Sequence, residues 1–398
     1  MSAVRLTLIL CAAEALSMAG TFAFPGLLPV FFEEWAISTT EAGWIAGIFY
    51  GGYTAAVPVL MSLTDRIDAR RVYIGGALVG AAGYLGFALF AAGFWSALGW
   101  WTLAGMGLAG TYMPGLRALV DRLGRDQESR AVAFYTSSFS LGTALSFALA
   151  GEAGRAWGWR APFFIGAAGA VLAAAIAFFV LKPARPARPE EPTPLFDFGP
   201  VLRNRRAMGY VLGYGVHTLE LFAYRSWLVA FLAFSLTLSA SPAFLQPTVV
   251  AMIAALVAMV SSVLGQEVAA RFGRQRIISV VMGVAMAIAF GFGYTAPLPF
   301  AAVVSVALVY AAVIQADSAA LTAGVVAVAD PGRRGATLAV HSVVGFAGAF
   351  VGPLALGVVL DLAGGAGRPL AWGLGFGLIG LFSLVEIAAL FWSLRGAR

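Results

Sequence analysis

The chain has 398 residues, of which 61% are hydrophobic and only 11% charged, with a mean hydropathy of +0.88. Soluble domains carry about 25% charged residues, so the composition excludes a soluble globular protein and predicts an all-α membrane protein with many spans. A single cysteine, Cys11, and two histidines exclude an internal disulfide and a metal centre rich in Cys or His, so we expect no metal and no cofactor. The net charge of +6 comes from arginines in short loops beside spans, which does not indicate nucleic-acid binding.

Apolar runs predict twelve spans in two groups of six. Ser38 and Glu41 form a possible capping box at the start of the second span. Between the groups, residues 182–206 are rich in proline and arginine, which predicts an extended cytoplasmic linker. The domains expected are therefore a bundle at 1–181, the linker at 182–206 and a bundle at 207–398. The spans are expected near residues 6–31, 38–63, 72–94, 97–119, 131–150, 162–181, 208–236, 247–269, 277–294, 300–328, 337–360 and 370–393.

The distribution of basic residues predicts the orientation. If the N-terminus is inside, only Arg155, Arg160 and Arg368 of the 25 Lys and Arg residues fall in outer loops, and Arg225 lies within a span. Positive charge gathers on the cytoplasmic side of membrane proteins. Both termini are therefore expected in the cytoplasm of a multi-pass protein, which we place in the bacterial inner membrane.

Two loops repeat at nearly the same offset. The segment 65–71 after the second span aligns with 270–276 after the eighth, and 128–130 before the fifth aligns with 332–334 before the eleventh. Equivalent loops at equivalent places indicate a duplicated bundle. The first loop, Asp65-Arg66-Ile67-Asp68-Ala69-Arg70-Arg71, resembles the signature of the major facilitator superfamily, although Met61 and Asp68 stand where that family has glycine.

This resemblance implies the fold of that family, two six-helix bundles that work by alternating access, in a chain acting as a monomer on a small molecule. It also implies gating roles for the charged residues of both loops. These are Asp65, Arg66, Arg70, Arg71, Arg271 and Arg274. In the second copy Ala270 replaces the acid.

Ionisable residues interrupt the apolar run at 215–227. At helical spacing His217, Glu220 and Tyr224 share one face, with Arg225 to one side. Charges at that depth are costly and usually face a protein interior or a watery cavity. Two interpretations are open: a polar lining for a bound solute, or a lock in which each charge is held by a neighbouring helix.

The family resemblance places the first, fourth, seventh and tenth spans around a central cavity, which adds Glu14, Tyr112, Gln315 and Asp317 to the candidates. At about 1.5 Å per residue, Glu220 and Asp317 lie at similar depth. Buried carboxylates take up and release protons more readily near neutral pH than exposed ones, so Glu14, Glu220 and Asp317 fit proton coupling. His341 and Glu386 are interpreted as packing residues.

The function expected is a secondary transporter of a small organic solute, coupled to protons. No nucleotide-binding GxxxxGK[ST], HExxH or GxSxG motif occurs, so neither an ATP-driven pump nor an enzyme is expected. Two alternatives remain, a non-transporting receptor or scaffold on a transporter fold, and an anion-selective facilitator that uses Arg225.

Overall fold

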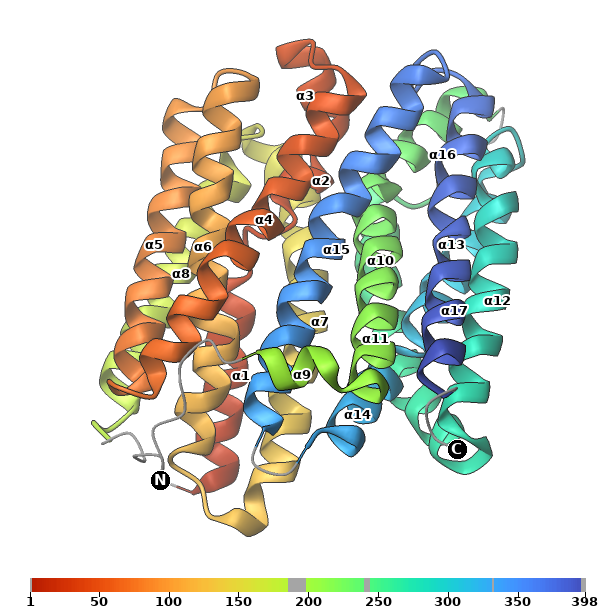
Figure 1. Ribbon diagram of the computed structural model, residues 1–398. Coiled ribbons are helices and arrows are strands. Elements are labelled where there is room, and N and C mark those ends of the chain that lie inside the picture. The colour runs from red at the N-terminus through yellow and green to blue at the C-terminus, as the bar shows by residue number, and fades with distance from the viewer. Residues whose placement is uncertain (1, 185–197, 240–243, 331–332, 395–398) are drawn as a thin grey trace. The chain divides into compact units, whose positions relative to one another are not determined.

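The computed structural model describes residues 2–184, 198–239, 244–330 and 333–394, and within them every regular element is a helix (Figure 1). The chain divides into two compact units, one of residues 1–30 and 48–195 and one of residues 31–47 and 196–398. The predicted linker falls largely on residues 185–197, which lie outside the described residues.

The first unit is built on six helices together with most of a seventh, α4, and part of α3. These are α1 Ala3–Ser17, α2 Ala23–Gly26, α3 Leu28–Trp35, α4 Thr39–Thr64, α5 Ala69–Phe90, α6 Phe94–Val120, α7 Arg125–Trp157 and α8 Ala161–Val180. In α5 and α6, which lie side by side in Figure 1, a Cβ added at Gly76 would meet the Gly110 Cα at 2.5 Å. Small residues allow this close approach, which replaces the hydrophobic drive that lipid cannot supply.

The second unit is organised around α10, which packs against α15, α17, α14 and α13. Its elements are α9 Gly199–Arg203, α10 Arg205–Leu238, α11 Pro247–Phe272, α12 Arg274–Phe292, a 3₁₀ turn η1 Gly293–Thr295, α13 Phe300–Gln315, α14 Ser318–Val328, α15 Arg334–Leu362, α16 Pro369–Leu381 and α17 Ser383–Leu394. Its core includes Val211, Ile278, Met282, Leu321 and Leu390.

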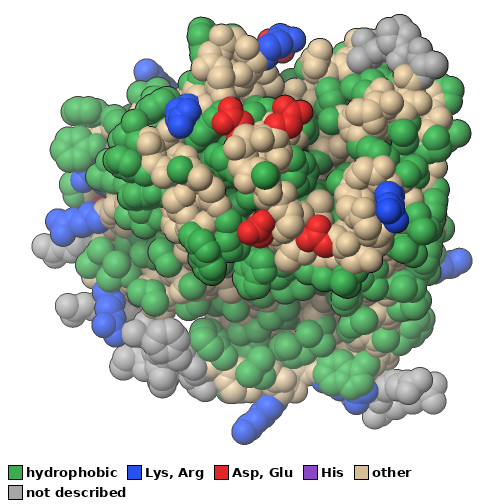
Figure 2. All heavy atoms as spheres, turned by 90° about the horizontal axis from the view of Figure 1, so that it is seen from above, with side chains coloured by type: hydrophobic (Ala, Val, Ile, Leu, Met, Phe, Trp, Pro, Cys, Tyr) green, Lys and Arg blue, Asp and Glu red, His purple; other side chains and the backbone are tan. Residues whose placement is uncertain are grey.

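Ten helical stretches of the described chain are long and apolar enough to cross a membrane. The predicted spans at 6–31 and 97–119 are not among them. The first is divided into α1, α2 and α3, and α6, at 27 residues, is long enough but rich in glycine and tryptophan. The twelve-span count and the two six-helix bundles therefore stay predictions. Many large hydrophobic side chains of the described residues are exposed, as expected of a chain solvated by lipid, and hydrophobic side chains are also visible at the end of the molecule shown in Figure 2.

The predicted capping box is confirmed at the start of α4. The Ser38 N–H donates to Glu41 Oε2 at 2.8 Å, and the Glu41 N–H donates to Ser38 Oγ at 3.1 Å. The backbone N–H groups of Thr39 and Thr40 donate to the Asp361 carboxylate on α15. These contacts explain why residues 31–47 belong to the second unit, whereas α4 continues from residue 48 into the first.

Candidate functional site

The middle of α10 is buried on every side, and 72% of the residues in its most apolar stretch are buried. The chain can pack this closely because α15 presents glycines to it: a Cβ at Gly348 would lie 2.0 Å from the Gly215 carbonyl oxygen. A span enclosed by protein carries polar side chains only where neighbouring helices provide their partners. The polar stripe predicted on this helix lies in such surroundings.

His217 faces the point where α13 and α14 meet. Its Nδ1 lies 2.9 Å from Asp317 Oδ1, and both side chains are fully buried. Asp317 occupies the junction after α13 ends at Gln315, and it caps α14 without a side-chain hydrogen bond. The distance between the two atoms is that of an ion pair, but their orientation is not that of a hydrogen bond. We therefore interpret the pair as a close electrostatic contact.

Tyr214 links the only two histidines of the sequence. Its ring stacks on His341 with centroids 3.9 Å apart and on His217 with centroids 5.7 Å apart. His341 Nε2 is also 3.2 Å from the Thr322 hydroxyl. His341, which from its sequence position is expected to be a packing residue, lies next to the candidate cluster through this stack.

Glu220 has two hydroxyl donors and no exposed surface. Tyr310 of α13 donates to its Oε1 at 2.7 Å, and Ser383 of α17 donates to its Oε2 at 3.2 Å. Tyr224, one turn further along α10, donates to the Ala307 carbonyl at 2.7 Å, and its ring meets Tyr310 edge-on. The shared face predicted for the stripe is thus turned toward the tenth predicted span.

Arg225 and Gln315 lie in the same part of the second unit. Arg225 Nη2 donates to Gln315 Oε1 at 3.2 Å, and the guanidinium lies over the Phe222 ring. Gln315 is the last residue of α13, so this contact holds the end of that helix two residues before Asp317. The candidates of the seventh and tenth predicted spans therefore form one buried cluster.

Glu14 lies in the other unit with partners of its own. Tyr135 of α7 donates to Glu14 Oε2 at 3.0 Å and is also 3.2 Å from the Thr111 carbonyl. Glu14 is fully buried, and its Oε1 has no hydrogen-bond partner among the described residues. Tyr112 is partly buried and stacks on the Tyr135 ring at 6.3 Å, so it approaches the Glu14 group through an aromatic contact.

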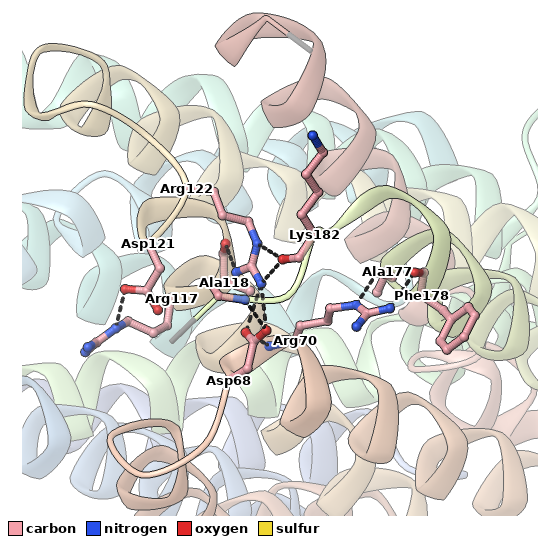
Figure 3. A network of polar contacts seen from close by, with 10 residues as sticks. Asp68, Arg70, Arg117, Ala118, Asp121, Arg122, Ala177, Phe178 and Lys182 are labelled. Atoms are coloured by element: carbon pink, nitrogen blue, oxygen red, sulfur yellow. Dashed lines mark hydrogen bonds and ion pairs between the residues drawn. The ribbon is translucent and has the colours of Figure 1, made fainter. Parts of the chain in front are cut away.

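The charged loop after α4 forms a network within the first unit (Figure 3). Asp68 caps α5 and receives two hydrogen bonds from Arg122 Nη2, at 2.9 and 3.0 Å. Arg122 also donates to the Lys182 carbonyl. Burial alone raises the pKa of the Asp68 carboxyl, but the Ala184 N–H and the Arg122 guanidinium hold that pKa below its usual range.

Of the predicted gating residues, Arg70 contacts Asp68 directly, because its backbone N–H donates to Asp68 Oδ1 at 3.0 Å. Asp65 is 3.6 Å from Arg117, and Arg70 donates to the Ala177 and Phe178 carbonyls. Arg66 and Arg71 of the same loop are exposed; in the second unit, Arg271 is exposed and lies over Phe272, and Arg274 is partly buried.

Sequence reasoning missed the partners that complete both groups. Tyr310, Ser383 and Tyr135 are single hydroxyl residues in apolar runs, a signal too common to single them out. In the sequence, Asp68 stands out only as a departure from a glycine. Within the described residues, no group of three His, Cys, Asp or Glu side chains is arranged to hold a metal ion.

The fold is that of a helical membrane protein with polar groups buried among its helices. The family model of the Major Facilitator Superfamily matches residues 10–325, and the chain belongs to that family. No curated protein sequence matches it.

Among solved structures, a bacterial homologue of the human lysosomal transporter Spinster, in an inward-facing and occupied conformation, is similar with a TM-score of 0.77 and 16% identity, covering 98% of this chain and 97% of that one. A mutant of the nucleoside transporter NupG gives a TM-score of 0.80 at 15% identity, covering 97% and 99%. These likenesses concern the fold.

Proposed function

We propose that the protein is a secondary active transporter that moves a small organic solute across the inner membrane by alternating access, driven by protons. The observation that carries this proposal is the buried cluster around α10, in which Glu220, Asp317 and His217 are all fully buried. Ionisable side chains within membrane-spanning helices usually mark substrate or proton pathways. The membership of a transporter family adds weight to the same interpretation.

The two acids have different surroundings, which suits them to different tasks. Two hydroxyl donors stabilise a negative charge on Glu220, whereas in the part of the chain that the structure describes the Asp317 carboxylate accepts no hydrogen bond and has the imidazole of His217 as its charged neighbour. The Asp317–His217 pair is neutral when it holds one proton, whether on the carboxyl or on the ring. Loss of that proton leaves an uncompensated buried charge, so proton binding and helix position at the α13–α14 junction become linked.

The topology and the gate remain part of this proposal. Both termini and the linker 182–206 are placed in the cytoplasm, and the loop residues from Asp65 to Arg71, with Arg271 and Arg274, are proposed to control opening. The small-molecule substrate, the coupling to protons and the monomeric state belong to the proposal as well. Loss of the electrostatic pairing at Asp65 is expected to slow turnover.

The test begins with a search for the solute. Purified full-length protein is screened for compounds that raise its thermal stability, because a ligand of the native state stabilises it. Nucleosides belong in the panel, because one structural neighbour is a nucleoside transporter. A stabilising compound is then used for uptake into proteoliposomes under an imposed proton gradient.

Glu220→Gln and Asp317→Asn are expected to abolish proton-driven accumulation while exchange of solute across the membrane persists. Glu152→Gln is the matched control, because Glu152 is exposed and pairs with Arg155, three residues further along α7. Wild-type accumulation and pH dependence in both site variants would refute the coupling and favour the structural lock. Uptake that is independent of the proton gradient and is lost in Arg225→Ala would favour the anion-selective facilitator. Absence of uptake for every stabilising compound would favour the non-transporting receptor or scaffold.

A further inference from the structure

A third buried carboxylate in the second unit has no role in the function proposed above. Glu386 lies in the first turn of α17 and is fully buried. Neither of its oxygens has a hydrogen-bond partner, and no ion pair reaches it, among the described residues. An isolated ionised carboxylate in such surroundings costs several kcal/mol even after relaxation, so its charge state needs an explanation.

The position of Glu386 is set by the way α17 packs along α10. Ser383, three residues earlier on α17, donates to Glu220 Oε2, so residues 383 and 386 face α10 together. On α10, a Cβ added at Gly213 would lie 3.3 Å from Glu386 Oε1. The missing side chain at Gly213 thus leaves the space that the carboxyl group fills. Gly213 lies seven residues, about 10 Å, before Glu220 on the same face of the helix.

The charged neighbours of Glu386 are acids. Glu220 of α10 and Asp317, just before α14, both act on Glu386 electrostatically. His217 of α10 lies against Asp317, with Nδ1 2.9 Å from its Oδ1. The α12 residues in this core, Ile278 and Met282, are apolar, and α16 carries no ionisable residue. A negative charge on Glu386 would therefore meet repulsion without a compensating donor.

We propose that Glu386 is a further proton-binding group of this protein, which holds its proton in the conformation described and is coupled to Glu220 across the packed faces of α10 and α17. Proton loss breaks the O–H bond of the carboxyl group and transfers the proton to water, leaving a carboxylate that repels Glu220. Its part in transport rests on the proposed function, whereas its protonation does not.

Infrared difference spectroscopy of the full-length protein during a pH titration, with no solute added, tests the proposal. A protonated carboxylic acid has a C=O stretch separate from that of a carboxylate. Glu386→Gln should remove one such band at neutral pH. As the pH is raised, the Glu386 band should disappear at a lower pH in Glu220→Gln than in the wild type, because a neighbouring negative charge no longer helps Glu386 to retain its proton.

Glu152→Gln is the control, because Glu152 is an exposed residue paired with Arg155 and should contribute no protonated band at neutral pH. Thermal unfolding gives a second readout: a neutral amide in place of a neutral acid should leave the midpoint of Glu386→Gln unchanged or higher. Retention of every wild-type carboxylic acid band in Glu386→Gln overturns the proposal, and so does a large fall in its unfolding midpoint.

These outcomes are separable from those of the transport assay. If Glu220→Gln and Asp317→Asn lose accumulation while Glu386→Gln loses no band, the transporter proposal is supported and the proton-binding role of Glu386 is refuted. If the band is lost and no solute is transported, the proton-binding role of Glu386 stands without the transporter.

Discussion

The Asp68–Arg122 network yields a stability prediction that does not depend on transport. Asp68→Asn keeps an oxygen that caps α5 but removes the charge that Arg122 faces through two hydrogen bonds. The two side chains are only 9% and 10% exposed, so solvent screens the pair weakly. Hydrogen bonds to charged groups contribute about 1.5–3 kcal/mol, and we expect a loss of that size. Asp68→Ala should cost about 1 kcal/mol more, because the cap is lost as well.

The free energy of unfolding of the full-length protein in mixed micelles of detergent and dodecyl sulfate measures this loss. Asp121→Asn is the control, because its pair with Arg117 is more exposed and within one helix, where such pairs contribute about 0.3–0.5 kcal/mol. A double-mutant cycle with Arg122→Ala isolates the coupling between the two side chains.

The pH dependence of the same measurement has a definite sign. The pKa of Asp68 is lowered in the folded protein, so its stabilising contribution is fully present above the unfolded-state pKa and is lost as the pH falls through the folded-state pKa. The difference between wild type and Asp68→Asn should therefore shrink on acidification below the ordinary pKa of aspartate. Equal losses for Asp68→Asn and Asp121→Asn, or a difference that persists in acid, would refute the argument.

Two further predictions concern packing and topology. Gly348→Ala should lower the free energy of unfolding by about 1–3 kcal/mol, because the added Cβ would lie 2.0 Å from the Gly215 carbonyl oxygen. Gly283→Ala on α12 is the control, because its Cβ enters open space and should raise the free energy of unfolding by about 0.5–1 kcal/mol. Similar changes in the two variants would argue against the close α10–α15 contact. A cysteine at Thr193, in a Cys11→Ser background, should resist an impermeant thiol reagent in intact cells and react after lysis, with a cysteine at Glu152 as the outside control; labelling of the Thr193 position from outside would reverse the proposed orientation.

The sequence by itself determined the features that depend on local pattern. Long apolar runs with few charges identify a membrane protein because the bilayer core excludes unpaired charge. The spacing of Ser38 and Glu41 located the start of α4, since a capping box involves residues only three apart. The common face of His217, Glu220 and Tyr224 follows from helical periodicity, and the structure turns that face toward Tyr310 and Asp317.

Only the tertiary structure decided which partner each buried group has. Asp317 meets His217, and Arg225 donates to Gln315, because the chain leaves its helix at 316–317 and so places these two side chains at different points beside α10. Ser383 reaches Glu220 because α17 packs along α10, a contact between residues 163 positions apart. Periodicity fixes the face that a side chain occupies, but the partner depends on which helices pack together and where they break, and neither is a local property of the sequence.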